Sequence, residues 1–141
     1  MKKVISVLAV FVLISCGAKK TSKSNVALYE VLTQQSDGGG NIKFFEILSE
    51  PNEILMLQND PLLKSKMKHD DINNSNYVIL NMGEKNSGGY SIGVEKVEET
   101  EKNIIITVKE NAPAKDAMVI QVISYPYTVV KVHSKKEIIV K

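Results

Sequence analysis

Apolar and polar positions alternate in short runs along most of the chain, and polar or glycine-rich connections separate the runs. Val, Ile, Tyr and Phe dominate the runs, and these residue types are enriched in β-strands. Several short strands spaced by turns predict a mainly β domain, either a sandwich or a barrel. The predicted strands are residues 26–33, 42–48, 77–82, 90–97, 103–110, 118–124, 128–133 and 137–140.

Two polar turns lie between neighbouring strands of this pattern. Ser36–Asn41 contains three consecutive glycines and predicts a hairpin between the strands on either side of it, and Glu99–Asn103 predicts another. Along residues 90–97 the alternation places four apolar side chains on one side, provided that the register shifts once. These side chains are Tyr90, Ile92, Val94 and Val97.

Residues 49–68 follow a different pattern, which predicts one or two short helices. Ser49 is a candidate N-cap, and Pro51 suits the first turn of a helix. The run Glu53–Leu57 supplies an apolar face, and Asp60-Pro61 is expected to break the segment in two.

The N-terminus has the pattern of a secretory signal peptide. Met1–Lys3 is positively charged, and Val4–Ile14 is an uncharged apolar run, too short for a membrane span of ~20 residues. Leu13–Cys16 (Leu-Ile-Ser-Cys) resembles the lipobox of bacterial lipoproteins. The resemblance implies cleavage after Ser15 and a lipid on the thiol of Cys16, which would be the contact with the membrane.

Cys16 is the single cysteine of the chain, so no intramolecular disulfide competes for it. Residues 16–25 are polar and predict a flexible tether, followed by one domain over residues 26–141. The alternatives are a plain signal peptide with a chance cysteine, or a buried N-terminal strand. Gly17 after the cysteine gives no obvious inner-membrane retention signal, which favours an outer-membrane location facing the periplasm, with the cell surface as the alternative.

The charge balance argues against nucleic acid as a partner. The chain has 18 basic and 16 acidic residues, and removal of residues 1–15 takes away Lys2 and Lys3 and no acid, which leaves a net charge of zero. Every one of these basic residues is lysine. Specific binding to nucleic acid usually relies on a basic face and on bidentate arginine contacts.

Motifs that carry catalysis are missing from the sequence. It contains no G-x-S-x-G, P-loop or H-E-x-x-H pattern. His69-Asp70-Asp71 lies in the polar segment 69–76, which is predicted as a solvated loop rather than a metal site. His133 falls in a strand pattern and is expected at the surface or at a sheet edge. We therefore expect no enzyme, no cofactor and no small-molecule substrate.

Two segments combine tyrosines with backbone-shaping residues. Gly83–Ile92 contains Gly88-Gly89-Tyr90, and Ile123–Val130 contains Tyr125-Pro126-Tyr127. One interpretation is a pair of tight turns with tyrosines packed as corners. The other is a pair of neighbouring loops that form an aromatic partner-binding surface. In the second case the binding residues are Asn86, Gly88, Gly89, Tyr90, Tyr125, Pro126 and Tyr127.

The same two segments resemble the C-terminal domain of the PrcB protease-complex family. The resemblance rests on GEKNSGGYSIGVEKV and ITVKENAPAKDAMVIQVISYPYTVVKV, and it covers about Tyr77–Val132. The matching positions are Tyr90, Pro113, Gln121, Pro126 and Tyr127. The namesake of that family is a lipid-anchored accessory subunit of a surface protease complex and not a peptidase. The resemblance therefore implies a non-enzymatic module of the cell envelope that binds another protein. A protease is the kind of partner that the family name suggests.

A fainter resemblance links the two segments to chagasin-like inhibitors of cysteine proteases. Those inhibitors place two binding loops on an immunoglobulin-like sandwich, so the resemblance implies that version of the β fold. Asn86–Tyr90 and Ser124–Tyr127 are similar to the two loops, although the first proline and the arginine of the family pattern are missing. Protease inhibition and a structural envelope lipoprotein without a specific partner stand as the alternative functions.

Overall fold

The structure, a computed structural model, describes residues 27–141. The predicted signal peptide, lipidated cysteine and tether lie outside the described residues. The elements in chain order are β1 (Tyr29–Gln35), β2 (Phe44–Leu48), α1 (Pro51–Gln58), α2 (Asp71–Asn74), β3 (Asn76–Asn81), β4 (Ser91–Glu99), β5 (Asn103–Asn111), β6 (Tyr127–Val132) and β7 (Glu137–Val140). No helix among residues 27–141 is long and apolar enough to cross a membrane.

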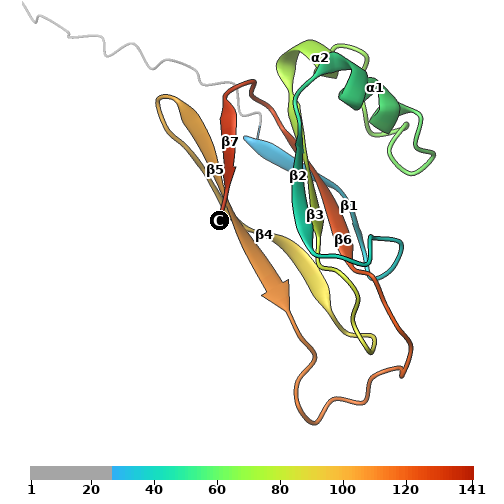
Figure 1. Cartoon of the computed structure of the whole chain (residues 1–141). Helices are drawn as coiled ribbons and strands as arrows, with labels where there is room; N and C mark the ends of the chain where they lie inside the picture. The colour runs from blue at the N-terminus through green and yellow to red at the C-terminus, as the bar shows by residue number, and fades with distance from the viewer. Residues whose placement is uncertain (1–26) are drawn as a thin grey trace, which may run out of the picture.

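The strands form two sheets that face each other (Figure 1). One sheet has the order β1-β6-β3-β2, and its neighbours are antiparallel. The other has the order β4-β5-β7, in which β7 runs parallel to β5. The prediction of a mainly β fold is confirmed, and of its two versions the described residues form the sandwich, since neither sheet closes into a barrel.

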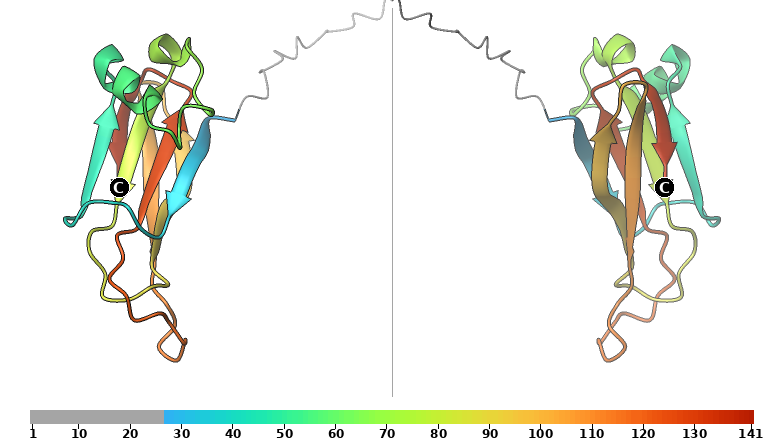
Figure 2. Two further views of the ribbon diagram at one scale, coloured as in Figure 1. Left: turned by 90° about the vertical axis from the view of Figure 1, so that its right-hand side faces the viewer. Right: turned by 90° about the vertical axis from the view of Figure 1, so that its left-hand side faces the viewer.

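Side-chain alternation along the central strands builds two apolar cores. In β3, Val78 and Leu80 belong to the core between the sheets, whereas Tyr77 and Ile79 belong to a second core on the outer face of the four-stranded sheet. The helical segment, residues 49–74, lies over one end of that outer face, as Figure 2 shows, and contributes Ile54 and Leu63 to the second core. Strands β3 and β6 are therefore buried on both faces.

The predicted hairpin of the first two strands is wrong. β1 and β2 lie at opposite edges of one sheet, and β6 and β3 lie between them. β3 and β6 carry apolar side chains on both faces. They therefore take the central positions of the sheet, where both faces are buried. The hairpin of β4 and β5 is confirmed, and a bulge between Val94 and Lys96 supplies the shift of register that the apolar pattern required.

The prediction of one or two short helices around residues 49–68 is confirmed, since α1 lies there, but its N-cap is Glu50 rather than Ser49. The segment predicted as a polar loop contains the short helix α2, which corrects that prediction. Residues 118–124 belong to neither sheet of the described chain, because their backbone hydrogen bonds to residues 85–88 involve Ile120 and Ser124 and form no continuous ladder. An apolar alternating pattern by itself does not provide a hydrogen-bonding partner.

A buried ion pair fixes the start of α2 to the sheet. The Lys131 ammonium on β6 lies 2.7 Å from the Asp71 carboxylate, which also accepts hydrogen bonds from the Tyr77 hydroxyl (3.2 Å) and the Lys68 backbone N–H (2.6 Å). Burial alone would raise the pKa of Asp71. The hydrogen bond and positive charge of Lys131, together with the hydrogen bond from the Lys68 N–H, outweigh burial and hold the pKa of Asp71 below its usual value. Burial and the Asp71 carboxylate raise the pKa of Tyr77.

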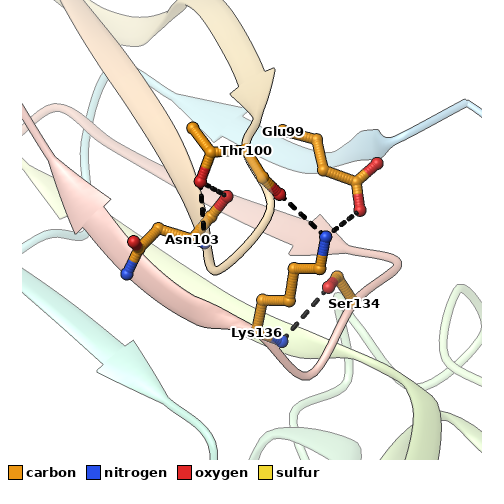
Figure 3. A network of polar contacts seen from close by, with 5 residues as sticks. All are labelled: Glu99, Thr100, Asn103, Ser134 and Lys136. Atoms are coloured by element: carbon orange, nitrogen blue, oxygen red, sulfur yellow. Dashed lines mark hydrogen bonds and ion pairs between the residues drawn. The ribbon is translucent and has the colours of Figure 1, made fainter.

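A polar network holds the end of the sandwich where β4 turns into β5 (Figure 3). The Lys136 ammonium donates to the Glu99 carboxylate and to the Thr100 carbonyl, each at 2.8 Å. The Thr100 hydroxyl and the Asn103 backbone exchange hydrogen bonds across the turn. The network joins the β4–β5 turn to the connection that precedes β7 at this end of the sandwich.

Candidate functional site

The two segments that carry the tyrosine motifs lie side by side at the other end of the sandwich. Residues 83–90 lead into β4, and residues 112–126 join β5 to β6 (Figure 1). Lys85 and Ser124 exchange two backbone hydrogen bonds (2.9 and 3.0 Å), and the Gly88 N–H donates to the Ile120 carbonyl (2.9 Å). The fold thus joins two segments that are far apart in the sequence.

Side chains add to this joint. The buried Ser124 hydroxyl donates to the Ser87 carbonyl at 2.8 Å. The Tyr125 hydroxyl donates to the Glu84 carboxylate at 3.2 Å. Partial burial and this contact with Glu84 raise the pKa of Tyr125. The hydroxyl consequently stays protonated and available as a donor across the neutral pH range.

A third segment, Gly38–Gly40, completes this end of the molecule. The Gly39 N–H donates to the Tyr125 carbonyl (2.9 Å), and the Asn81 side chain exchanges hydrogen bonds with the backbone of Gly40. A Cβ on Gly39 would lie 2.2 Å from the Asn81 carboxamide oxygen and 2.8 Å from the Tyr125 carbonyl. We call the three segments, residues 36–43, 83–90 and 112–126, the loop end. The triple glycine was visible in the sequence, but only as a turn.

Gly89 has a conformational role that Gly88 lacks. Its φ of +87° lies in the region that favours glycine, and a Cβ there would come within 3.0 Å of Pro113. A Cβ on Gly88 would have the Ile120 carbonyl oxygen as its nearest neighbour, at an ordinary contact distance of 3.7 Å. Gly89 therefore allows the loop before β4 to pack against Pro113 on the connection between β5 and β6.

The tyrosines of the two motifs do not share one surface. Tyr90 is half-buried against the core between the sheets, with the Lys85 ammonium 5.8 Å from its ring centroid. Tyr127 is half-buried against the second core, on the outer face of the four-stranded sheet. Burial and the nearby Asp60 raise the pKa of Tyr127. Asn86 is exposed, and Pro126 is buried. The partner-binding role of these residues stays a prediction.

Exposed apolar side chains of the loop end cluster on the connection between β5 and β6, and Ile42 in residues 36–43 is also exposed. Met118 is fully exposed, Ile120 is 76% exposed, and Val122 and Ile123 are each 54% exposed. We call these four residues the apolar loop patch. They are the part of the site that sequence reasoning missed, because the segment was predicted as a strand whose apolar side would be covered.

The chemistry that the loop end offers is that of a contact surface. It presents aliphatic side chains, tyrosine rings and backbone groups held by hydrogen bonds. Over residues 27–141, no group of histidine, cysteine, aspartate and glutamate side chains is arranged to hold a metal ion. His69 is exposed, and His133 is half-buried.

Comparison with known families supports the resemblance found in the sequence. Residues 76–133 match the family model described as PrcB C-terminal. The match begins at β3, ends just after β6, and includes two of the three segments of the loop end. Nothing among curated proteins or solved structures matches the chain at a significant level.

Proposed function

We propose that this protein is a lipid-anchored, non-enzymatic binding module of the cell envelope, which engages another protein through its loop end. The PrcB C-terminal match over residues 76–133 and the lipobox at Leu13–Cys16 support this proposal from the sequence. A protease is the class of partner that the family resemblance suggests.

The apolar loop patch is the observation that carries the proposal. Met118, Ile120, Val122 and Ile123 lie within six positions of one another on one connection, and each is at least half exposed. Clustered exposed apolar side chains commonly mark a protein contact, because each Å² that a partner covers contributes about 25 cal/mol. A connection without such a role would be expected to present polar side chains to water.

The internal hydrogen bonds of the loop end favour binding without a large loss of conformational entropy. Ile120 and Ser124, which bracket much of the patch, are tied by backbone bonds to Gly88 and Lys85. A segment that is already ordered loses less freedom when a partner docks on it. The Tyr125 hydroxyl and the exposed Asn86 provide polar groups beside the patch.

The proposal is tested by capture from envelope extracts with the native chain and a Val122→Glu variant. Leu62→Glu is the matched control, because Leu62 is also 54% exposed and lies on the helical segment instead. We expect one partner to be retained by the native chain and by the control and to be lost with Val122→Glu. A charge at a central contact would weaken binding by about 2 kcal/mol or more.

Other outcomes decide against the proposal. Loss of the partner with both variants would place the contact elsewhere or reflect unfolding, which circular dichroism of each variant distinguishes. Retention with both would remove the loop end from the interface. Tight inhibition of a papain-like protease, abolished by Val122→Glu, would replace the proposal with the chagasin-like function. Recovery of no specific partner would favour the structural envelope protein.

A further inference from the structure

A second surface lies along β2 and α1, away from the loop end's apolar patch. β2 is an edge strand, so the backbone on one of its sides has no neighbouring strand among residues 27–141. Between β2 and α1 runs a groove of about 290 Å³, whose apolar lining comes from Leu48, Met56 and Leu57. Met56 is 75% exposed, so a large apolar side chain faces the solvent at this groove.

The charged side chains that line this groove are all acidic. They are Glu46 on β2, Glu53 on α1 and Asp60 just after the helix. The Glu53 carboxylate already accepts the Ser49 and Glu50 backbone N–H groups, and Asp60 accepts the Leu62 N–H. The Glu46 carboxylate is exposed and has no hydrogen bond or ion pair with another described residue.

A second pocket of about 230 Å³ lies next to the groove, and Leu57 and Asp60 line both. Phe44 and Tyr127 also line this second pocket. Aromatic faces close to a carboxylate favour cationic groups, because both the ring quadrupole and the negative charge attract them. None of the described residues that line this pocket is a lysine.

The register of β2 against β3 fixes which side chains of β2 lie on the same face as the acidic groove. Along β2, Phe44, Glu46 and Leu48 share the helix-covered face, since they pair with Asn81, Ile79 and Tyr77 of β3. Phe45 and Ile47 share the other face and are 38% and 39% exposed. A strand added along β2 would place every second side chain beside Glu46 and the groove, and the alternate ones beside Phe45 and Ile47.

We infer that the β2 edge binds an extended segment of another protein in which lysine or arginine alternates with apolar residues. The basic side chains would lie over the acidic groove, and the apolar ones would cover Phe45 and Ile47. A second copy of this chain fits poorly, because pairing β2 with β2 would bring two acidic grooves together. The nearby Lys43 does not offset that repulsion, since it already forms an ion pair with Glu110.

The inference is tested with the full chain in mild detergent and the fluorescein-labelled peptide Val-Lys-Val-Lys-Val-Lys-Val, by fluorescence anisotropy. We expect saturable binding that weakens as salt is raised from about 50 mM to 500 mM. A peptide with glutamate in place of lysine should not bind. A peptide N-methylated at alternate backbone nitrogens, along the edge that would pair, should lose binding because it cannot complete the strand ladder.

Variants locate the site on the molecule. Glu46→Lys should weaken binding about tenfold, because it replaces an attraction with a repulsion at an exposed position. Glu95→Lys is the matched control, since Glu95 is an exposed carboxylate on β4 of the other sheet, and it should leave binding unchanged. Val122→Glu should also leave peptide binding unchanged, which separates this inference from the function proposed for the loop end.

Three results would overturn the inference. Equal weakening by Glu46→Lys and Glu95→Lys would mean that the peptide responds only to net charge. Full binding of the N-methylated peptide would exclude strand addition. Choline chloride can replace an equal concentration of sodium chloride, which keeps the ionic strength constant. Complete displacement of the peptide under that exchange would identify an organic-cation pocket instead of a peptide site.

Discussion

The buried pair of Asp71 and Lys131 allows a sharp test of how the helical segment is held on the sheet. Asp71→Ala removes the carboxylate and leaves the ammonium of Lys131, a residue that is 3% exposed, without an opposite charge. The Tyr77 hydroxyl, on a fully buried residue, loses its acceptor in the same step. The change therefore leaves a buried charge and a buried donor unsatisfied.

The expected loss of stability is large. Removal of one member of a buried ion pair typically costs about 3–5 kcal/mol, because the remaining charge stays desolvated. A domain of this size is stable by roughly 5–15 kcal/mol in total, so Asp71→Ala should lower the urea midpoint substantially. Lys131→Met should cost less, since the Asp71 carboxylate keeps its hydrogen bonds from Tyr77 and from the Lys68 N–H.

A double-mutant cycle measures the interaction itself. The variant with both changes should be less destabilised than the sum of the two single variants, with a coupling of roughly 2 kcal/mol. Circular dichroism during urea unfolding is the appropriate readout, since the chain contains no tryptophan. The matched control is Glu98→Ala, which breaks the exposed Lys96–Glu98 pair at the same 2.7 Å separation and should cost less than about 1 kcal/mol.

The pH dependence follows from the lowered pKa of Asp71. In the unfolded chain its carboxyl titrates near pH ~3.9, and in the folded protein it titrates below its usual value. The stabilisation is therefore complete above the unfolded pKa and is lost as the pH falls through the folded pKa. Lys131→Met should flatten this acid limb. Additive single changes, or an Asp71→Ala cost no greater than that of Glu98→Ala, would refute the reasoning.

Three further predictions concern the glycine loop, the tyrosines and the anchor. Gly39→Ala should destabilise the fold by about 2 kcal/mol or more, whereas Gly88→Ala, with room for its Cβ, should cost less than about 1 kcal/mol; similar urea midpoints would contradict this. Tyr127→Ala should lower the melting temperature more than Tyr125→Ala, because Tyr127 packs against the second core. Cys16→Ser should yield an unprocessed precursor, while the native chain partitions into detergent; a freely soluble mature native chain would contradict the anchor.

Part of the loop end was predictable from residue types. The glycines and the tyrosine-proline motif marked residues 83–89 as a loop and residues 125–127 as a corner, and the sandwich prediction implied that such loops gather at an end. Gly38–Gly40 was seen only as a hairpin turn, because nothing local indicates that its backbone bonds to Tyr125. The apolar loop patch was missed for a related reason, since the pattern at 118–124 is that of a strand.

The sequence by itself determined most of the local conformations. Short alternating runs specified most of the strands, including the shift of register in β4, and the mainly β class followed from them. Only the tertiary structure decided which strands pair, since the positions of β1 and β2 depend on β3 and β6 being apolar on both faces. It also decided that Tyr127 faces the helical segment while Tyr90 faces the other core. The physical reason is that burial of a side chain depends on what packs against it, and those neighbours come from distant parts of the chain.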